Sequence, residues 1–426
     1  MNNVQDLNIK KEILPIFDYS LNLFARKKIL ELLETPLLDE KRIIERQKIF
    51  RGFASNIKVL DNYSYTVLYL NEVHFFLNEL KAEDLKNTKY HFFTSNKGEI
   101  LFNNKIYQLI LFFHRLELNY FSRLKLDVFP ECYRSEINRI MSFLSYFDLR
   151  KYEYLLREKK LRKSHINEIK EKISYLILDN RIEVFWEDLF LFEAYLSINR
   201  AILVNKFTFP IFTQTEINLV DFYHPLIKNP VKNSLHTATN VIVLNGPNMS
   251  GKSTILKSIS LCLYLGNLGF GIPASKGEIP IFANFSIGIN RRDDILNGYS
   301  HFMLEVINLK NIVERASKGI NCFAVLDELF SGTNVEDALE ICKTTINGVS
   351  NYGSSLFFIS THIQELKNVL SDKVVTYYLD CDLIDDVPTF TYKLKKGWSD
   401  IKLGRILFDK AGLNSFFNSE VNNNES

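Results

Sequence analysis

An apolar run that ends in a glycine-rich turn constrains the fold of this chain more than any other feature. Residues 241–244 read Val-Ile-Val-Leu, and residues 246–254 read Gly-Pro-Asn-Met-Ser-Gly-Lys-Ser-Thr. The apolar run predicts a buried strand, and the small residues after it predict a tight loop that leads into a helix from about Ser253. From about residue 216 onward strands alternate with helices, which is the pattern of an α/β domain.

The loop has the spacing of a phosphate-binding site, G-x-x-x-x-G-K-[ST]. Small residues let successive N–H groups point at phosphate oxygens, and the following helix directs its positive end to the same place. We expect Lys252 to reach the β- and γ-phosphates of a nucleotide and the hydroxyl of Ser253 to bind Mg²⁺. A chance glycine-rich turn is the alternative. The predicted nucleotide-binding residues are Gly246, Pro247, Asn248, Met249, Ser250, Gly251, Lys252, Ser253 and Thr254.

Two carboxylates follow a second apolar run, residues 321–326. Parallel sheets bind ligands at the carboxyl ends of their strands, so Asp327 and Glu328 are expected beside the phosphates. Because successive side chains of a strand point in opposite directions, the two acids can have different roles. We assign Asp327 to the Mg²⁺ shell and Glu328 to polarising the attacking water. The alternative is a strand end with two solvated acids.

A third apolar run, residues 354–360, leads to Thr361 and His362. A histidine at this strand end can donate a hydrogen bond to a γ-phosphate, and a surface histidine is the alternative. In a further segment, residues 293–305, Ser300 precedes an apolar-periodic helix and can act as its N-cap.

Together these segments resemble the ATPase domain of the MutS mismatch-repair proteins. The loop is similar to the MutS form in its Pro-Asn-Met interior, and residues 293–305 are similar to the family's D-D-x-x-x-G-x-S-T-F-M-x-E segment. Residues 327–333 and 360–366 resemble its D-E-L-x-x-G-T and [AS]-T-H-x-x-E-L motifs. The resemblance implies an α/β P-loop NTPase domain of ABC type, a parallel-rich sheet flanked by helices, that hydrolyses ATP with Mg²⁺. It also implies that two such domains pair, with Ser300 of one subunit completing the other subunit's γ-phosphate site.

The resemblance extends beyond this domain. Residues 33–47 are similar to the start of the MutS core helical domain, residues 191–198 to the helix that closes it, and residues 221–227 to the segment before the nucleotide domain. The expected domains are therefore an all-α core/lever domain at residues 1–215, a P-loop ATPase domain at 216–395, a helix-turn-helix dimerisation element at 396–418 and a disordered tail at 419–426.

Four residues depart from the family pattern. Tyr299 and His301 stand where Arg and Thr are usual, and Phe330 and Ser331 replace a Gly-Arg-like pair after the two acids. None of the four is a predicted ligand of phosphate or metal. The departures therefore concern communication between subunits and not nucleotide binding.

Full-length MutS proteins carry a mismatch-reading domain and a connector domain before the core helices. This sequence reaches the core resemblance by residue 35, and independent domains rarely have fewer than ~50 residues. We therefore expect a short form without those two domains. The Phe-x-Glu at residues 185–187 follows helical spacing and is interpreted as helix packing, not as a mismatch wedge.

Composition adds little to this interpretation. The net charge of +2 gives no indication of nucleic-acid binding. The five cysteines show no C-x-x-C pairing and predict thiols of a reducing, cytoplasmic compartment. No uncharged apolar run approaches ~18 residues, so no membrane span is expected. Residues 152–178 predict one long charged helix, in which the basic run at 157–163 is either a DNA-phosphate contact or a solvated helix face with a turn near residues 163–164.

These expectations lead to an ATP-dependent DNA-binding protein of MutS type. It would pair as a homodimer or heterodimer through its ATPase domain and act on double-stranded DNA of a preferred structure. Two alternatives remain, an ATP-gated module acting on branched DNA or ribosomes and an ATP-binding scaffold that pairs with a longer MutS partner. The complete set of Lys252, Ser253, Asp327, Glu328 and His362 argues against lost hydrolysis and so against the scaffold. Adenine recognition stays open, with Val231 as a loose candidate.

Overall fold

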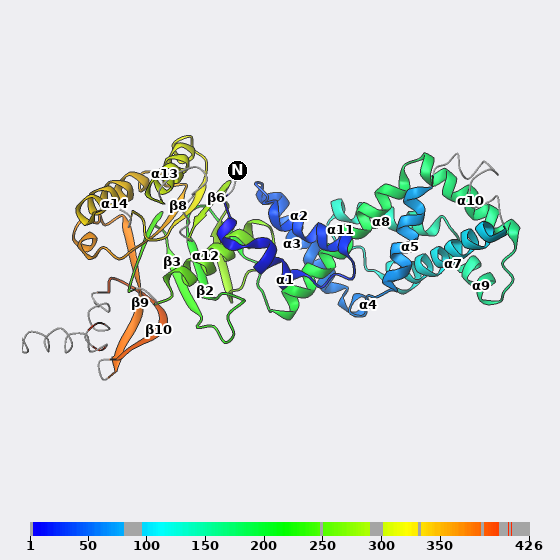
Figure 1. Cartoon of the computed structure of the whole chain (residues 1–426), viewed down its shortest axis with the longest axis horizontal. Coiled ribbons are helices and arrows are strands. Elements are labelled where there is room, and N and C mark those ends of the chain that lie inside the picture. The colour runs from blue at the N-terminus through cyan, green and yellow to red at the C-terminus, as the bar shows by residue number, and fades with distance from the viewer. Residues whose placement is uncertain are drawn as a thin grey trace, which may run out of the picture. The chain divides into compact units, whose positions relative to one another are not determined.

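The computed structural model describes residues 3–80, 96–247, 250–289, 301–330, 334–384 and 387–399, together with Phe408 and Lys410. The chain divides into two compact units (Figure 1). A helical unit comprises Leu14–Thr35 and Ile44–Val204, and an α/β unit comprises Met1–Ile13, Pro36–Ile43 and Asn205–Ser426. The boundary therefore follows Val204, earlier than the expected residue 215, because strand β1 (Ile211–Thr213) already pairs with a strand of the α/β unit.

The helical unit is built around one long buried helix. α11 (Arg181–Val204) is buried around most of its circumference, as expected for a helix enclosed by others. It packs against α1, α2, α5, α8 and α10. The bounds of the other helices are α1 (Leu14–Phe17), α2 (Leu23–Glu34), α3 (Glu40–Ser55), α4 (Ile57–Leu60), α5 (Val67–Glu79), α7 (Asn96–Asn119), η3 (Phe121–Arg123), α8 (Glu131–Ser145), α9 (Leu149–Arg157) and α10 (Lys163–Leu178).

Aromatic side chains fill the core of the helical unit. Phe185 is 1% exposed and stacks on Phe143, with ring centroids 4.0 Å apart. Trp186 is buried as well, whereas Glu187 is exposed and forms an ion pair with Lys28. The Phe-x-Glu sequence therefore contributes to helix packing, as its spacing predicts.

The expected single helix over residues 152–178 is wrong. Two helices, α9 and α10, cover this region, and Lys159 between them takes a left-handed φ of 55°. A continuous helix would place the like charges of the basic run one turn apart, which is unfavourable. The turn separates these charges, and Lys163 at the start of α10 forms an ion pair of 2.8 Å with Glu99.

One acidic side chain is buried inside the helical unit. Glu193 on α11 is 4% exposed, and its Oε1 accepts a hydrogen bond of 2.8 Å from the Tyr63 hydroxyl. Its Oε2 accepts hydrogen bonds from the Asn22 amide at 2.5 Å and the Tyr65 hydroxyl at 3.1 Å. Burial raises the pKa of Glu193 to about 7, and the three donors only partly offset this rise.

Two mixed sheets form the α/β unit. The strand orders are β1-β5-β2-β3 and β10-β9-β4-β8-β7-β6, and in the second sheet all neighbours are parallel except β10 and β9. The other strand bounds are β2 (Ile217–Phe222), β3 (Asn233–Thr237), β4 (Val241–Asn245), β5 (Lys276–Pro280), β6 (Asn284–Gly288), β7 (Cys322–Leu326), β8 (Leu356–Thr361), β9 (Val374–Ile384) and β10 (Val387–Lys396). The helical segments are η1 (Gln5–Leu7), η2 (Ile9–Ile13), α12 (Lys252–Asn267), α13 (His301–Ser317), α14 (Val335–Val349) and η4 (Gln364–Asn368).

The register of the six-stranded sheet aligns the ends of its central strands. Asn245 at the end of β4 pairs with Thr361 at the end of β8, and Leu326 at the end of β7 pairs with Ile359. Alternate residues of β4, β7 and β8 form an apolar core with α13 and α14 on one face of this sheet. The segments that follow the three strands therefore begin at one edge.

The first residues of the chain add to this sheet. The Asn3 N–H donates to the Phe285 carbonyl and the Asn3 carbonyl accepts from the Ile287 N–H, both at 2.8 Å. The Asp6 carboxylate accepts a hydrogen bond of 2.8 Å from the Ile289 N–H, directly after β6. Residues 3–13 were expected in the helical domain, but these backbone bonds attach them to the edge strand of the α/β unit.

The expected helix-turn-helix at residues 396–418 lies outside the described residues except for 396–399, Phe408 and Lys410, and the expected tail at 419–426 lies wholly outside them. Within the described ranges, no helix combines the length and apolar character that crossing a membrane requires.

Candidate functional site

The loop between β4 and α12 has the backbone that its glycines predict. Gly246 and Gly251 adopt φ values of 145° and 97°, which residues with a Cβ rarely take. A Cβ on Gly251 would also lie 3.2 Å from Cδ1 of the Tyr392 ring. The side chain at this position is therefore limited by both conformation and space. Asn248 and Met249 of the same loop lie outside the described residues.

Lys252 and Ser250 direct polar groups at the inside of the loop. The Lys252 ammonium is buried and donates to the carbonyls of Gly246 at 2.8 Å and Pro247 at 3.0 Å. The Ser250 hydroxyl is buried without a hydrogen-bond partner in the described part of the chain. A buried cation, an unsatisfied hydroxyl and the N-terminus of the 16-residue helix α12 together fit an anionic group such as phosphate.

The two acids lie at the same edge of the sheet as the loop. The Ser253 hydroxyl donates to Asp327 Oδ2 at 2.7 Å, which joins the start of α12 to the end of β7. The Ser360 hydroxyl donates to Asp327 Oδ1 and accepts from the Glu328 N–H at 2.8 Å. The predicted phosphate loop, the predicted metal ligand and the end of β8 are therefore directly connected.

The oxygen ligands at this edge suit Mg²⁺ of the kind that accompanies a nucleotide. The Ser253 hydroxyl and the Asp327 carboxylate supply two oxygens side by side. The described residues contain no cluster of three or more His, Cys, Asp or Glu side chains arranged for a metal. Magnesium commonly binds through one or two protein oxygens plus water and substrate phosphates, so the pair fits that mode rather than an all-protein cage.

The other predicted site residues lie after the end of β8, on the first turn of α12, or outside the described residues. His362 is exposed and follows β8 directly, at the end of the strand that pairs with β4. Thr361 Oγ1 accepts from the Ile363 N–H at 3.0 Å, which closes the turn around His362. Thr254 is exposed on the first turn of α12. Ser300, the residue expected to act in trans, lies outside the described residues.

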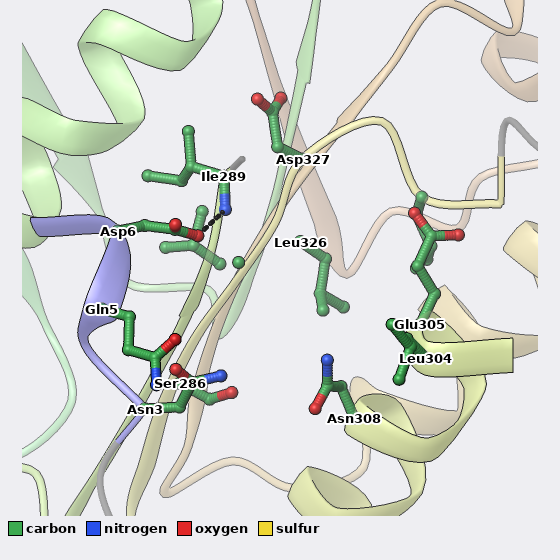
Figure 2. Close-up of a pocket in the computed structure, with 13 residues that line it drawn as sticks. Asn3, Gln5, Asp6, Ser286, Ile289, Leu304, Glu305, Asn308, Leu326 and Asp327 are labelled. Carbon is green, nitrogen blue, oxygen red and sulfur yellow. Dashed lines mark hydrogen bonds between the residues drawn. The ribbon is translucent and has the colours of Figure 1, made fainter. Parts of the chain in front are cut away.

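Two cavities adjoin the site. One of about 290 Å³ lies against Gly251 and Thr254, and its lining includes Val231, Tyr223 and Tyr392. The second, of about 180 Å³, lies between β6, β7 and α13, with Asp327 on one side and Glu305 on the other (Figure 2).

Comparison with known proteins supports the resemblance to MutS. The family model of MutS domain V matches residues 242–416. The DNA mismatch repair protein MutS of Bacillus subtilis (strain 168) is 28% identical over 209 residues, which cover 46% of this chain and 24% of that protein. The MutS of Macrococcus caseolyticus is 25% identical over 361 residues, 81% of this chain and 40% of that protein. The chain is similar to MutS proteins, and the family model places the match at residues 242–416. It spans well under half the length of the curated relatives that it matches.

The MutS resemblance drawn from the motifs is thus confirmed, and the structure adds three features that the motifs did not indicate. Ser360 bridges the two acids, although only its place in a motif was noted. Tyr392 packs beside the loop from β10, more than a hundred residues further along the chain. His224 lines the larger cavity, where burial lowers its pKa. A pattern within one segment cannot reveal such partners, because they come from other parts of the chain.

One departure from the MutS pattern has a structural counterpart. Phe330 stands where the family usually has glycine, yet its φ of 59° is in the left-handed region that glycine adopts freely. Its side chain is 1% exposed, and its ring centroid lies 5.6 Å from that of Phe302. Apolar burial offsets the backbone strain at this position.

Proposed function

We propose that this MutS-like chain binds ATP with Mg²⁺ at the edge of the sheet where β4, β7 and β8 end, and that it hydrolyses the ATP. The observation that carries the proposal is the contact of 2.7 Å between the Ser253 hydroxyl and Asp327 Oδ2. This contact joins the phosphate-type loop after β4 to Asp327, the acid that follows β7 in the same sheet. A nucleotide site of P-loop type requires such a contact. A glycine-rich turn that arose by chance would not be expected to contact an acid at the end of a buried strand.

Each residue has a role that follows from its chemistry. The Lys252 ammonium would exchange its loop carbonyls for the β- and γ-phosphates, and the loop N–H groups with the N-terminus of α12 would hold the remaining phosphate oxygens. Ser253 and Asp327 would hold Mg²⁺, which neutralises charge on the phosphates. Glu328 would orient and polarise the attacking water, and His362 would donate to the γ-phosphate.

The cavity of about 290 Å³ is the place we assign to the base and ribose. It adjoins Gly251 and Thr254, the part of the loop that lies beside Tyr392. Aromatic and aliphatic side chains such as Tyr392 and Val231 suit the flat face of an adenine ring. This placement gives the candidate Val231 a physical basis.

At the level of the whole protein, we propose that ATP binding and hydrolysis at a paired interface change the conformation of a DNA-bound dimer. Ser300 would complete the partner's site, and the helical unit would contact double-stranded DNA of a preferred structure. The relatives named DNA mismatch repair protein MutS support this choice. The exposed basic run between α9 and α10 is the candidate for phosphate contacts.

The site is tested with two variants and two matched controls. Lys252→Ala should weaken ATP binding by about 100-fold, because it removes charge-assisted bonds to phosphate. Glu328→Gln should retain ATP binding and lower turnover by at least about 100-fold. Lys257→Ala on the same helix and Glu365→Gln on η4 serve as controls and should change neither quantity. Tight ATP binding by Lys252→Ala would place the nucleotide elsewhere.

The nucleic-acid partner is tested by ATPase stimulation at two salt concentrations. The panel contains homoduplex, mismatched duplex, four-way-junction DNA and ribosomes. Stimulation by duplex or junction DNA that falls with salt would support DNA binding through phosphates. Stimulation by ribosomes alone would favour the ribosomal alternative, and no stimulation by any of them would favour an ATP-binding scaffold.

A further inference from the structure

Three consecutive residues after β7 each have one backbone group held by a side chain from a different element. The Glu328 N–H donates to Ser360 Oγ on β8 at 2.8 Å. The Leu329 carbonyl accepts from the Cys342 thiol on α14 at 3.4 Å. The Phe330 N–H donates to Glu305 Oε2 on α13 at 3.1 Å. The segment that carries the proposed catalytic acid is therefore fixed from three directions.

The backbone of this segment has a conformation that its residues disfavour. Glu328 and Phe330 have φ values of 52° and 59°, in the left-handed region that residues with a Cβ disfavour. Such a conformation persists only where the surroundings determine it. Leu329 and Phe330 are 3% and 1% exposed, so packing holds their side chains while the three hydrogen bonds hold their backbone.

Of the three contacts, the one from Glu305 is made by a carboxyl group. A carboxylate is a stronger acceptor of a backbone N–H than a neutral hydroxyl, and the Glu305 contact of 3.1 Å is longer than the Ser360 contact of 2.8 Å. Burial raises the pKa of the Cys342 thiol to about 12, and the nearby negative charge of Glu305 adds to this rise. The thiol therefore keeps the proton that it donates. Figure 2 shows Glu305 on α13 and Asp327 among the residues that line the same cavity.

We propose that Glu305 is a positioning residue that holds the Glu328 backbone in the conformation required to polarise the attacking water. The proposal rests on the ATP hydrolysis proposed above and adds that the catalytic carboxylate depends on α13 as well as on the sheet. Without the Glu305 carboxylate, the Phe330 N–H loses its acceptor and the left-handed turn loses one of its three anchors. ATP binding does not depend on this turn, because the phosphate loop and Lys252 are built from β4 and α12.

The test compares Glu305→Ala and Glu305→Gln with the wild-type protein. Turnover is measured by phosphate release at saturating ATP, and binding is measured with a fluorescent ATP analogue. Glu305→Ala should lower kcat about tenfold, the loss expected for one charge-assisted hydrogen bond. Its dissociation constant for the analogue should stay within about twofold. Glu305→Gln should recover part of the turnover, since its amide oxygen can still accept the Phe330 N–H but without the charge.

Glu314→Ala is the matched control, because Glu314 lies on the same helix, is exposed, and pairs only loosely with Lys310 at 3.8 Å. It should leave both kcat and binding unchanged. If Glu305→Ala does not fold, Glu305→Asp replaces it, since the carboxylate one methylene shorter no longer reaches the Phe330 N–H.

The outcomes separate this inference from the function on which it rests. A wild-type protein that binds ATP without turnover would overturn the proposed hydrolysis. Wild-type turnover that Glu305→Ala leaves unchanged would overturn the positioning role alone. A Glu305→Gln variant as slow as Glu305→Ala would also overturn it, because the hydrogen bond would then not be the cause. Equal losses of binding, turnover and melting temperature in Glu305→Ala would assign Glu305 a merely structural role.

Discussion

Replacing Glu193 by glutamine should remove a large pH dependence from the stability of the helical unit. The Glu193 carboxyl group lies in a closed environment formed by Tyr63, Tyr65 and Asn22, and Arg200 lines the small cavity beside it. Burial raises its pKa from 4.5 to about 7. Glutamine has the same shape and stays neutral at every pH. Its amide can donate to one tyrosine oxygen while its carbonyl accepts from the remaining donors.

The magnitude follows from proton linkage. Between pH 4.5 and about pH 7, the folded protein keeps a proton at Glu193 that the unfolded chain has released. Stability therefore falls as pH rises through this window, and the slope approaches about 1.4 kcal/mol per pH unit. The accumulated loss is about 3 kcal/mol, and about 2.5 kcal/mol of it falls between pH 5 and pH 8. Above the folded pKa this group causes no further change.

Urea unfolding of wild type and Glu193→Gln at pH 5, 6, 7 and 8 checks this expectation. Fluorescence of the buried Trp186 reports the helical unit, in a Trp398→Phe background that silences the other tryptophan. The difference in unfolding free energy should move in favour of glutamine by about 2.5 kcal/mol from pH 5 to pH 8. Glu183→Gln, at an exposed position of α11, should show no such trend. A constant difference across the series, or one that moves in favour of wild type, would refute the reasoning.

Two further predictions concern the nucleotide loop and the thiols. Gly251→Ala should weaken ATP binding at least about tenfold, because alanine disfavours a φ of 97° and its Cβ would press on Tyr392. The control is Gly353→Ala, whose added Cβ meets nothing within 4 Å and which should leave the ATP-binding titration unchanged. A disulfide reagent should label Cys132 alone in the folded protein and all five thiols after denaturation, since the other four are buried. Burial, and then nearby Glu45, raise the pKa of Cys132, so labelling should be slow at pH 7 and faster at pH 9. Labelling that persists in folded Cys132→Ser would contradict this assignment.

The central strands and the polar groups at their ends were predictable from the sequence, because each is a local pattern. The apolar runs before Gly246, Asp327 and Thr361 form β4, β7 and β8. Their side-by-side arrangement follows from the rule that parallel strands end at one edge. The hydroxyl of Ser253 then meets Asp327 without further assumptions.

Long-range partners were not predictable in this way. Asn3 and Asp6 lie in a segment without period or turn signal, and only the structure reveals that they bond to β6. Glu305 stood within a motif, but its contact with Phe330 depends on the packing of α13. The interruption between α9 and α10 was foreseen only as an alternative turn near residues 163–164, because a charged amphipathic pattern continues across it; the chain instead turns at Lys159, whose φ is 55°.

The attachment of the first residues to β6 has a consequence for synthesis on the ribosome. The hydrogen bond between Asp6 and the Ile289 N–H spans 283 residues. At roughly 5 to 20 residues per second, the N-terminal segment emerges some 15 to 60 seconds before its partner strand exists. All of Leu14–Thr35 and Ile44–Val204 is made in that interval. The helical unit can thus fold first, while the opening residues of the chain stay unpaired until the nucleotide sheet is finished.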